Sequence, residues 1–180
     1  MRMKKMHFFT RWTLFAAIGV YSVSAFAQSN NNINVKTSTA NGLCSISVPG
    51  GNAPETEKPM QLEFTLRPSD GLLRIAALVN GWPRAQEADP NRDFPVSLKF
   101  DTQQSTASDS GGYSSGFYDR LWGIWEGGDS SNELLLLLAD AQSVEVSADG
   151  LNLGQFNLQA QGMVYNWLNN CVVKQRAAGK

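Results

Sequence analysis

The sequence predicts an α+β domain, built on an antiparallel β-sheet or sandwich of about six strands, with two packed helices and one disulfide. Three observations indicate this class. Apolar residues alternate with polar residues in several short segments after residue 42, which is the period of a half-buried strand. Two later segments carry helix signals instead. Cys44 and Cys171 are the only cysteines in the sequence.

Six segments show the strand pattern. The clearest is 60–66, in which four apolar residues alternate with Gln61, Glu63 and Thr65. Residues 72–80 are more continuously apolar, which predicts a central strand. Asp149 and Gly150 predict a tight hairpin turn, and Gly154 predicts a bulge in the returning strand. The expected strands are 42–48, 60–66, 72–80, 94–100, 144–147 and 151–158.

Two helices are expected. Ser130 and Glu133 match a capping box, and the five leucines at 134–138 follow directly. Because successive residues on a helix are 100° apart, five leucines cover every face and predict a helix at 131–141 that is buried nearly all round. A buried strand is the alternative for this run, which is too short to span a membrane. Apolar residues at helical spacing predict the second helix at 161–170.

The first 27 residues are expected to be a secretory signal peptide. Basic residues precede an apolar core at 14–23, and Ala25-Phe26-Ala27 forms an A-x-A cleavage site before Gln28. No cysteine follows the site, so a lipid anchor is not expected. We therefore expect a periplasmic protein, cleaved between Ala27 and Gln28, with no membrane span in the mature chain.

The mature chain is expected to contain one domain. Residues 28–41 are rich in Asn, Ser and Thr and predict a flexible lead-in, 42–174 form the single periplasmic α+β domain, and 175–180 form a C-terminal tail. In an exported protein, Cys44 and Cys171 are expected to form a disulfide. Residues 102–116 hold almost no apolar side chains and predict a long mobile loop.

Histidine and charge exclude several functions. The single histidine, His7, lies in the leader, so the mature chain cannot form a Ser-His-Asp or Cys-His centre or a histidine-containing metal site. No metal or cofactor is expected. All 16 acidic residues but only about 11 of the 15 Lys and Arg follow residue 27, which leaves a net charge near −5. Nucleic-acid binding is therefore not expected.

The aromatic segment 113–125 is the best candidate for a binding surface. Tyr and Trp often anchor interfaces, and neighbouring charged residues supply polar contacts. The alternative is that these rings belong to the core and cover the leucine helix. The candidate binding residues are Tyr113, Phe117, Tyr118, Arg120, Trp122, Trp125 and Glu126.

Carboxylate pairs are the remaining route to acid–base catalysis. Glu126 with Asp129, or Asp119 with Glu126, could flank a glycosidic bond. A domain with 16 acidic residues brings some carboxylates together in any fold, and the mature chain has no S-x-x-K motif. We therefore expect a protein without catalytic activity.

The C-terminal third of the mature chain carries a family resemblance. Within residues 137–171, two leucines are followed by V-x-V, G-x-x-L-x-x-F-x-L and L-x-x-C. This pattern resembles the end of bacterial periplasmic proteins such as the invasion-associated locus B family and type VI secretion accessory proteins. Such proteins often begin the last helix with Gly and Ala, where this chain has AQGMV at 160–164. The resemblance implies a β-rich domain and a binding or secretion-associated role, and it transfers no catalytic residue.

Together these observations favour a non-catalytic periplasmic binding protein that engages another periplasmic or secreted protein. It would be a secretion-system accessory, or an inhibitor or immunity protein against a cell-wall-directed toxin. Two alternatives stay open: a carboxylate-type enzyme acting on cell-wall glycan, and a factor for invasion or host contact.

Overall fold

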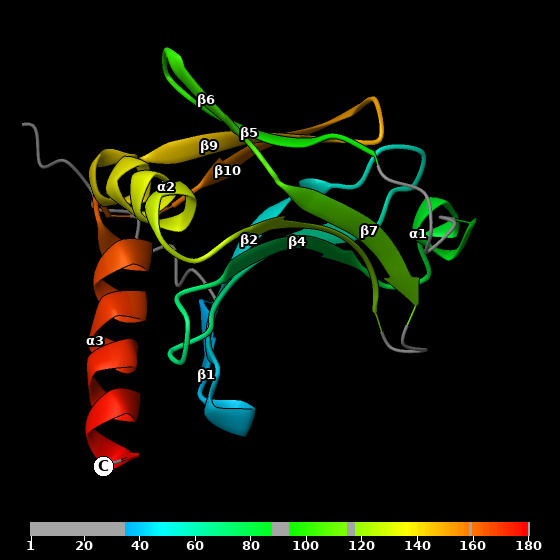
Figure 1. Cartoon of the computed structure of the whole chain (residues 1–180). Helices are drawn as coiled ribbons and strands as arrows, with labels where there is room; N and C mark the ends of the chain where they lie inside the picture. The colour runs from blue at the N-terminus through cyan, green and yellow to red at the C-terminus, as the bar shows by residue number, and fades with distance from the viewer. Residues whose placement is uncertain (1–34, 88–93, 115–117, 159, 180) are drawn as a thin grey trace, which may run out of the picture. The chain divides into compact units, whose positions relative to one another are not determined.

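The computed structural model describes residues 35–87, 94–114, 118–158 and 160–179, which form ten strands, a short 3₁₀ helix and three α-helices (Figure 1). The elements in chain order are β1 (Lys36–Ser38), η1 (Ala40–Gly42), β2 (Cys44–Asn52), β3 (Pro59–Leu66), β4 (Leu73–Val79), α1 (Pro83–Glu87), β5 (Val96–Phe100), β6 (Gln103–Thr106), β7 (Asp109–Ser114), β8 (Asp119–Trp125), α2 (Asp129–Asp140), β9 (Ser143–Ala148), β10 (Leu151–Asn157) and α3 (Met163–Ala178). The predicted α+β class is confirmed.

The strands form two antiparallel sheets. The first sheet has the order β1-β2-β3-β4-β8-β7, and the second has the order β10-β9-β5-β6. The chain passes from β6 to β7 through Ala107 and Ser108, whose N–H groups donate to the carbonyls of Val96 and Ile124. These two bonds join the sheets along one side. Figure 1 shows the sheets as two layers, so the fold is a sandwich.

The core lies between the two layers. Phe64, Leu98, Trp125 and Phe156 are almost completely buried there, and each contributes roughly 1.5–3 kcal/mol through removal of apolar surface from water. Helices α2 and α3 lie at one end of the sandwich and α1 at the other (Figure 1). The α1 end is closed by the completely buried Trp82. In the described part of the chain, no helix is long and apolar enough to cross a membrane.

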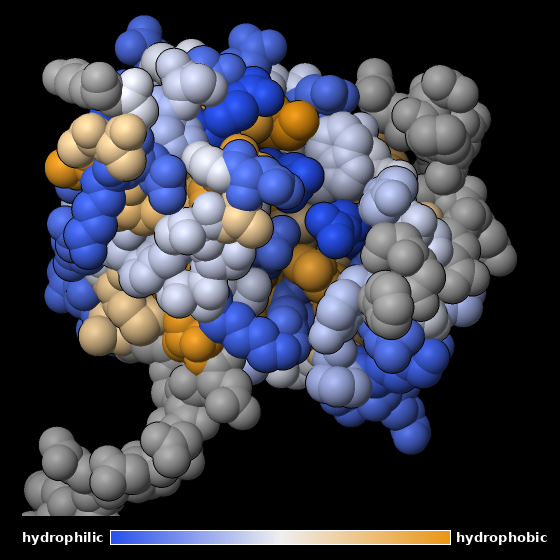
Figure 2. Space-filling model, turned by 90° about the horizontal axis from the view of Figure 1, so that it is seen from below, coloured by the Kyte–Doolittle hydropathy of each residue, from blue (hydrophilic) through white to orange (hydrophobic). Residues whose placement is uncertain are grey.

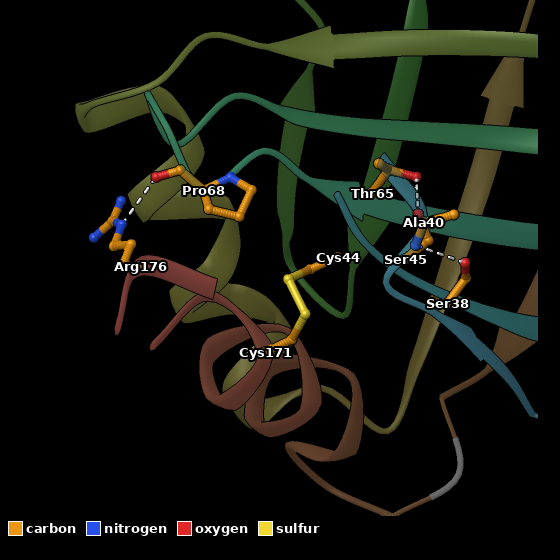
Figure 3. Close-up of a disulfide and its surroundings, with 8 residues drawn as sticks. All are labelled: Ser38, Ala40, Cys44, Ser45, Thr65, Pro68, Cys171 and Arg176. Atoms are coloured by element: carbon orange, nitrogen blue, oxygen red, sulfur yellow. Dashed lines mark hydrogen bonds between the residues drawn. A yellow bond between two sulfur atoms is a disulfide. The ribbon is translucent and has the colours of Figure 1, made fainter. Parts of the chain in front are cut away.

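The disulfide between Cys44 and Cys171 is present and joins β2 to α3 (Figure 3). The two Cα atoms are 5.9 Å apart, which is an ordinary separation for a disulfide. The cysteines are 127 residues apart in sequence, so loop-closure entropy predicts a stabilisation of about 4–5 kcal/mol. The Nε–H of Arg176 donates to the carbonyl of Pro68 at 2.9 Å and holds α3 near its C-terminal end as well.

All six predicted strands are confirmed, and so is the hairpin between the last two. Asp149 and Gly150 have φ values of 50° and 75°, as a type I′ turn requires. The register between β9 and β10 shifts between Asn152 and Gly154, where the bulge was predicted.

The predicted mobile loop at 102–116 is wrong, because β6 and β7 lie within it. Both are edge strands, so each pairs with one neighbour and little of its surface reaches the core. Their few inward groups are polar or small. The hydroxyl of Ser110 donates to the carbonyl of Phe94, and Ser105 accepts a hydrogen bond from Trp125. These strands therefore form without the apolar alternation that identifies half-buried strands.

The predicted boundaries at both ends of the domain also need correction. Part of the expected lead-in forms β1, whose three exposed residues pair with β2 through the backbone. Most of the expected tail belongs to α3, which continues to Ala178. Both extensions are polar. Strand β1 forms through backbone pairing, and no glycine or proline interrupts the last turns of α3 before Gly179. The apolar pattern therefore begins after the first strand and ends before the last helix does.

The helix at the leucine run is confirmed, but two details are wrong. Helix α2 begins at Asp129 with Gly128 at its N-cap, and no side chain caps it, so Ser130 and Glu133 do not form a capping box. The helix is not buried all round. Leu134 and Leu138 are buried, whereas Leu136 is 64% exposed. Helix α2 lies at the end of the sandwich, so only one of its sides meets the core.

Candidate binding face

The outer face of the six-stranded sheet carries several partly exposed aromatic and arginine side chains. Successive side chains in β8 alternate between the two faces of the sheet. Leu121 and Trp125 are therefore buried in the core, while Arg120, Trp122 and Ile124 lie on the opposite side and are partly exposed. Figure 2 views the molecule from this side, where apolar surface shows between polar and charged side chains.

The strand register arranges this outer face in three rows across β3, β4, β8 and β7. In that strand order the rows are Gln61, Leu78, Arg120 and Tyr113; then Glu63, Ala76, Trp122 and Gly111; then Thr65, Arg74, Ile124 and Asp109. Side chains that are neighbours within a row are in direct reach of one another. Ala76 and Leu78 are buried although they face outward, so the longer side chains around them form a rim over a small apolar floor.

The indole ring of Trp122 can lie over the middle row because Gly111 has no side chain. A Cβ atom at Gly111 would lie 2.5 Å from Cζ2 of Trp122, so the indole ring lies directly against the backbone of β7. Any larger residue at this position must displace the ring. The glycine therefore sets the position of the largest side chain on the face.

Arg120 and Tyr113 are directly opposite each other on β8 and β7. The guanidinium carbon lies 5.8 Å from the centre of the tyrosine ring, which is a cation–π contact. Such a contact contributes about 0.5–1 kcal/mol at an exposed site. Tyr113 is 56% exposed, so the contact holds an aromatic surface beside a positive charge at the edge of the sheet.

Arg74 lies in the third row, on the central strand β4. Its Nη2 is 3.7 Å from Oε1 of Glu63, a long ion pair. Burial lowers the pKa of Arg74, the charge of Glu63 raises it, and the like charge of Arg120 lowers it again. An arginine remains charged at physiological pH in spite of these effects. The positive charges of the two guanidinium groups therefore repel each other across the face.

Both arginines contain a buried donor without a partner. The Nε atoms of Arg74 and Arg120 are buried and make no hydrogen bond within the described part of the chain. A buried polar group without a partner costs about 1–3 kcal/mol, and more when it is charged. Each of these two N–H groups therefore has an unused hydrogen-bonding capacity.

Three of the seven predicted binding residues, Tyr113, Arg120 and Trp122, come together on this face. Tyr118 is 38% exposed and precedes β8 directly. It lines a shallow pocket with Lys58, Gln61 and other residues at the end of the first row.

The other predicted residues lie elsewhere. Trp125 is completely buried in the core, in agreement with the alternative interpretation of this segment. Glu126 is exposed beyond the opposite end of β8, where its carbonyl accepts a hydrogen bond from the N–H of Ser131. Phe117 lies outside the described residues, as do Ala27 and Gln28 of the expected cleavage site.

The structure does not bring Asp119 and Glu126 together. They lie at opposite ends of β8, roughly 23 Å apart for seven residues of extended chain. The carboxylate of Asp119 is buried and accepts a hydrogen bond from the N–H of Trp82 at 2.5 Å. Glu126 and Asp129 are both exposed near the start of α2. The described residues hold no cluster of three or more His, Cys, Asp or Glu that could bind a metal.

Sequence reasoning missed Arg74, Glu63 and Leu78. A signal for Arg74 was present, because it is the one charged residue in the apolar run LLRIAALV of the central strand β4. A charge in such a strand must leave the core, so it marks the outer face. Glu63 was placed on the outward side of its strand but was not linked to a site.

The fold and this face define a class: an antiparallel α+β sandwich, closed by a disulfide, with an aromatic and arginine-rich face on its larger sheet. Comparison of the chain with protein-family models, with curated proteins and with solved structures gave no match.

Proposed function

We propose that this chain is a non-catalytic periplasmic binding protein that engages another protein through the outer face of the six-stranded sheet. The observation that carries the proposal is the grouping of Tyr113, Arg120 and Trp122 on one open face around a small apolar floor. Tyr, Trp and Arg are the residues that dominate the energetics of protein interfaces.

The outer face of the second sheet supports this choice by contrast. Several of its polar side chains are paired with one another. The hydroxyls of Ser97 and Ser147 are hydrogen-bonded at 2.7 Å, and Lys99 forms an ion pair with Glu145 at 3.5 Å. A face whose polar groups pair in this way, and whose described residues include no exposed aromatic ring, suits contact with water.

The disulfide and the expected signal peptide support a periplasmic location, because disulfides persist in oxidising compartments. The resemblance of the C-terminal third to periplasmic secretion-associated proteins supports a partner that is exported too. Within this class, the role is that of a secretion-system accessory, or of an inhibitor or immunity protein against a cell-wall-directed toxin.

Photo-cross-linking in the native host tests this proposal. A photoreactive phenylalanine analogue replaces the exposed Tyr113, and a matched control carries it at Lys99, on the outer face of the second sheet. We expect irradiation to produce a discrete heavier species at position 113 and not at 99. Mass spectrometry of that species identifies the partner.

A second variant ties the cross-link to the face. Trp122→Ala, combined with the analogue at position 113, should abolish the heavier species while the disulfide still forms. No cross-linked species at position 113, or the same species at positions 113 and 99, would overturn the proposal.

A further inference from the structure

We propose that the binding face is a carboxylate receptor, in which Arg74 and Arg120 together hold an acidic group of the protein partner. This inference rests on the proposed function and adds the chemistry of the group that is recognised. It predicts a partner whose contact segment carries an Asp, a Glu or a C-terminal carboxylate next to an apolar side chain.

The two arginines are placed on either side of the middle of the face. Arg120 lies in the first row of the face and Arg74 in the third, so they flank the middle row that contains Trp122 and Ala76. The charge of Arg120 acts on the pKa of Arg74, so the two groups are electrostatically coupled. A carboxylate over the middle row would relieve this repulsion between like charges.

Both arginines have unused hydrogen-bonding capacity. The Nε–H groups of both arginines are buried without a partner in the described residues. A long arginine side chain that merely covers an apolar surface keeps its polar head in water. Here the inner nitrogen of each head is removed from water instead. Each head turns outward when the partner binds, and a planar carboxylate then accepts the side-on pair of N–H bonds that the guanidinium offers through Nε and one Nη.

Positive charge is concentrated on the two middle strands of the face. Arg74 on β4 and Arg120 on β8 bring two positive charges, whereas the negative charges of Glu63 and Asp109 lie on the flanking strands β3 and β7. The three rows are therefore neutral overall, while the residues after 27 carry a net charge near −5. An acidic group of the partner would lie over the positive middle strands.

Apolar and aromatic side chains lie around the two arginines. Trp122 lies against Gly111 beside the floor formed by Ala76 and Leu78, and Tyr113 covers the outer side of Arg120. An acidic residue bound here would place its neighbours in the partner chain against these rings. We therefore expect a short acidic and apolar segment to bind more tightly than a free small anion.

Titration with two matched peptides tests the inference directly. The probes are acetyl-Leu-Glu-Leu-amide and acetyl-Leu-Gln-Leu-amide, added to the oxidised full chain at constant ionic strength. The readout is the ¹H–¹⁵N correlation signal of each arginine Nε–H, assigned with Arg74→Lys and Arg120→Lys variants. We expect the Glu peptide to shift both signals in a saturable way, and the Gln peptide to bind at least about tenfold more weakly.

Two variants and one further probe complete the test. Arg120→Gln should weaken binding of the Glu peptide about tenfold, whereas Lys99→Gln, which removes a positive charge from the other sheet, should leave it unchanged. Absence of a shift with the Glu peptide, equal binding of the Gln peptide, or tighter binding of inorganic phosphate would each overturn the carboxylate assignment.

The cross-link at position 113 separates this inference from the proposed function. If the cross-link forms in the native chain and persists at full yield in the double variant Arg74→Gln/Arg120→Gln, the face binds a protein but not through a carboxylate. If no cross-link forms in the native chain, the proposed function itself fails.

Discussion

The Nε1–H of Trp125 donates a hydrogen bond of 2.8 Å to the hydroxyl of Ser105. This bond joins the two sheets, because Trp125 belongs to β8 of the larger sheet and Ser105 to β6 at the edge of the smaller one. The indole is completely buried, so the serine provides the one polar partner that its N–H needs. The pair explains how the polar strand β6 is held against an apolar core.

Replacing this serine should weaken the fold. Ser105→Ala leaves the buried indole N–H without a partner, and we expect the free energy of unfolding to fall by about 1–3 kcal/mol. Urea denaturation measures the change. The exposed neighbour Thr106 supplies the control, since Thr106→Ala should change stability by less than about 0.5 kcal/mol. Equal effects of the two substitutions would contradict a role for the hydrogen bond.

The position of Trp122 should depend on Gly111. Gly111→Val forces the indole away from β7, and we expect altered tryptophan fluorescence, loss of partner cross-linking and a stability loss of about 1–3 kcal/mol. Gly51→Ala is the matched control, because a Cβ at Gly51 meets no atom within 4 Å. Unchanged fluorescence in the Gly111 variant would show that the ring does not depend on this contact.

Asp70, in the turn between β3 and β4, should make the stability of the fold decrease in acid. Arg67 donates two hydrogen bonds to this carboxylate, and the N–H of Leu72 donates another, so the pKa of Asp70 lies below its usual value of 3.8. A lowered folded-state pKa stabilises the fold above the usual value, and this contribution is lost as the pH falls through the folded-state pKa.

Substitution of Asp70 therefore has a pH-dependent effect. Asp70→Asn should lower the melting temperature slightly at pH 7, and the difference from the native chain should vanish well below pH 3.8. Thermal melts at pH 7, 5 and 2.5 measure it. A difference that stays constant over this series would contradict the ionic origin of the effect.

Two leucines of α2 should differ sharply in their contribution to stability although they lie two residues apart. Leu134 is completely buried, so Leu134→Ala should cost about 2–5 kcal/mol through lost burial and a cavity. Leu136 is 64% exposed, so Leu136→Ala should cost less than about 0.5 kcal/mol. Chemical denaturation compares the two variants. Similar losses would mean that both sides of the helix are covered.

The apolar pattern predicted the elements that build the core. The alternation of Met60, Leu62, Phe64 and Leu66 with polar residues identified β3, and all four side chains are buried as expected. The pattern also missed β8, because its outward Trp122 and Ile124 are apolar like its inward Leu121 and Trp125, which hides the alternation. Nor could it identify β1, β6 or β7. These strands are held by backbone pairing and by single polar contacts such as that of Ser105, and neither leaves a periodic trace in the sequence.

The candidate face was predictable only in part. Tyr113, Arg120 and Trp122 stood out by residue type within one segment. Arg74 comes from a strand 46 residues earlier than Arg120, and only the pairing of β4 with β8 brings the two together. Trp125 has the same residue type as Trp122 but faces the core. Strand register decides which side chains of β8 face the core and which face outward. That register depends on the partner strand.

The cysteine pair also has a consequence for the order in which the protein is completed. Cys44 lies at the start of β2 and Cys171 lies in the last helix, so almost every element of the sandwich is synthesised between them. The covalent link therefore closes only on a chain that has been made as far as α3. A product that stops earlier keeps Cys44 without its partner. Oxidation of this pair thus records that synthesis reached the final helix.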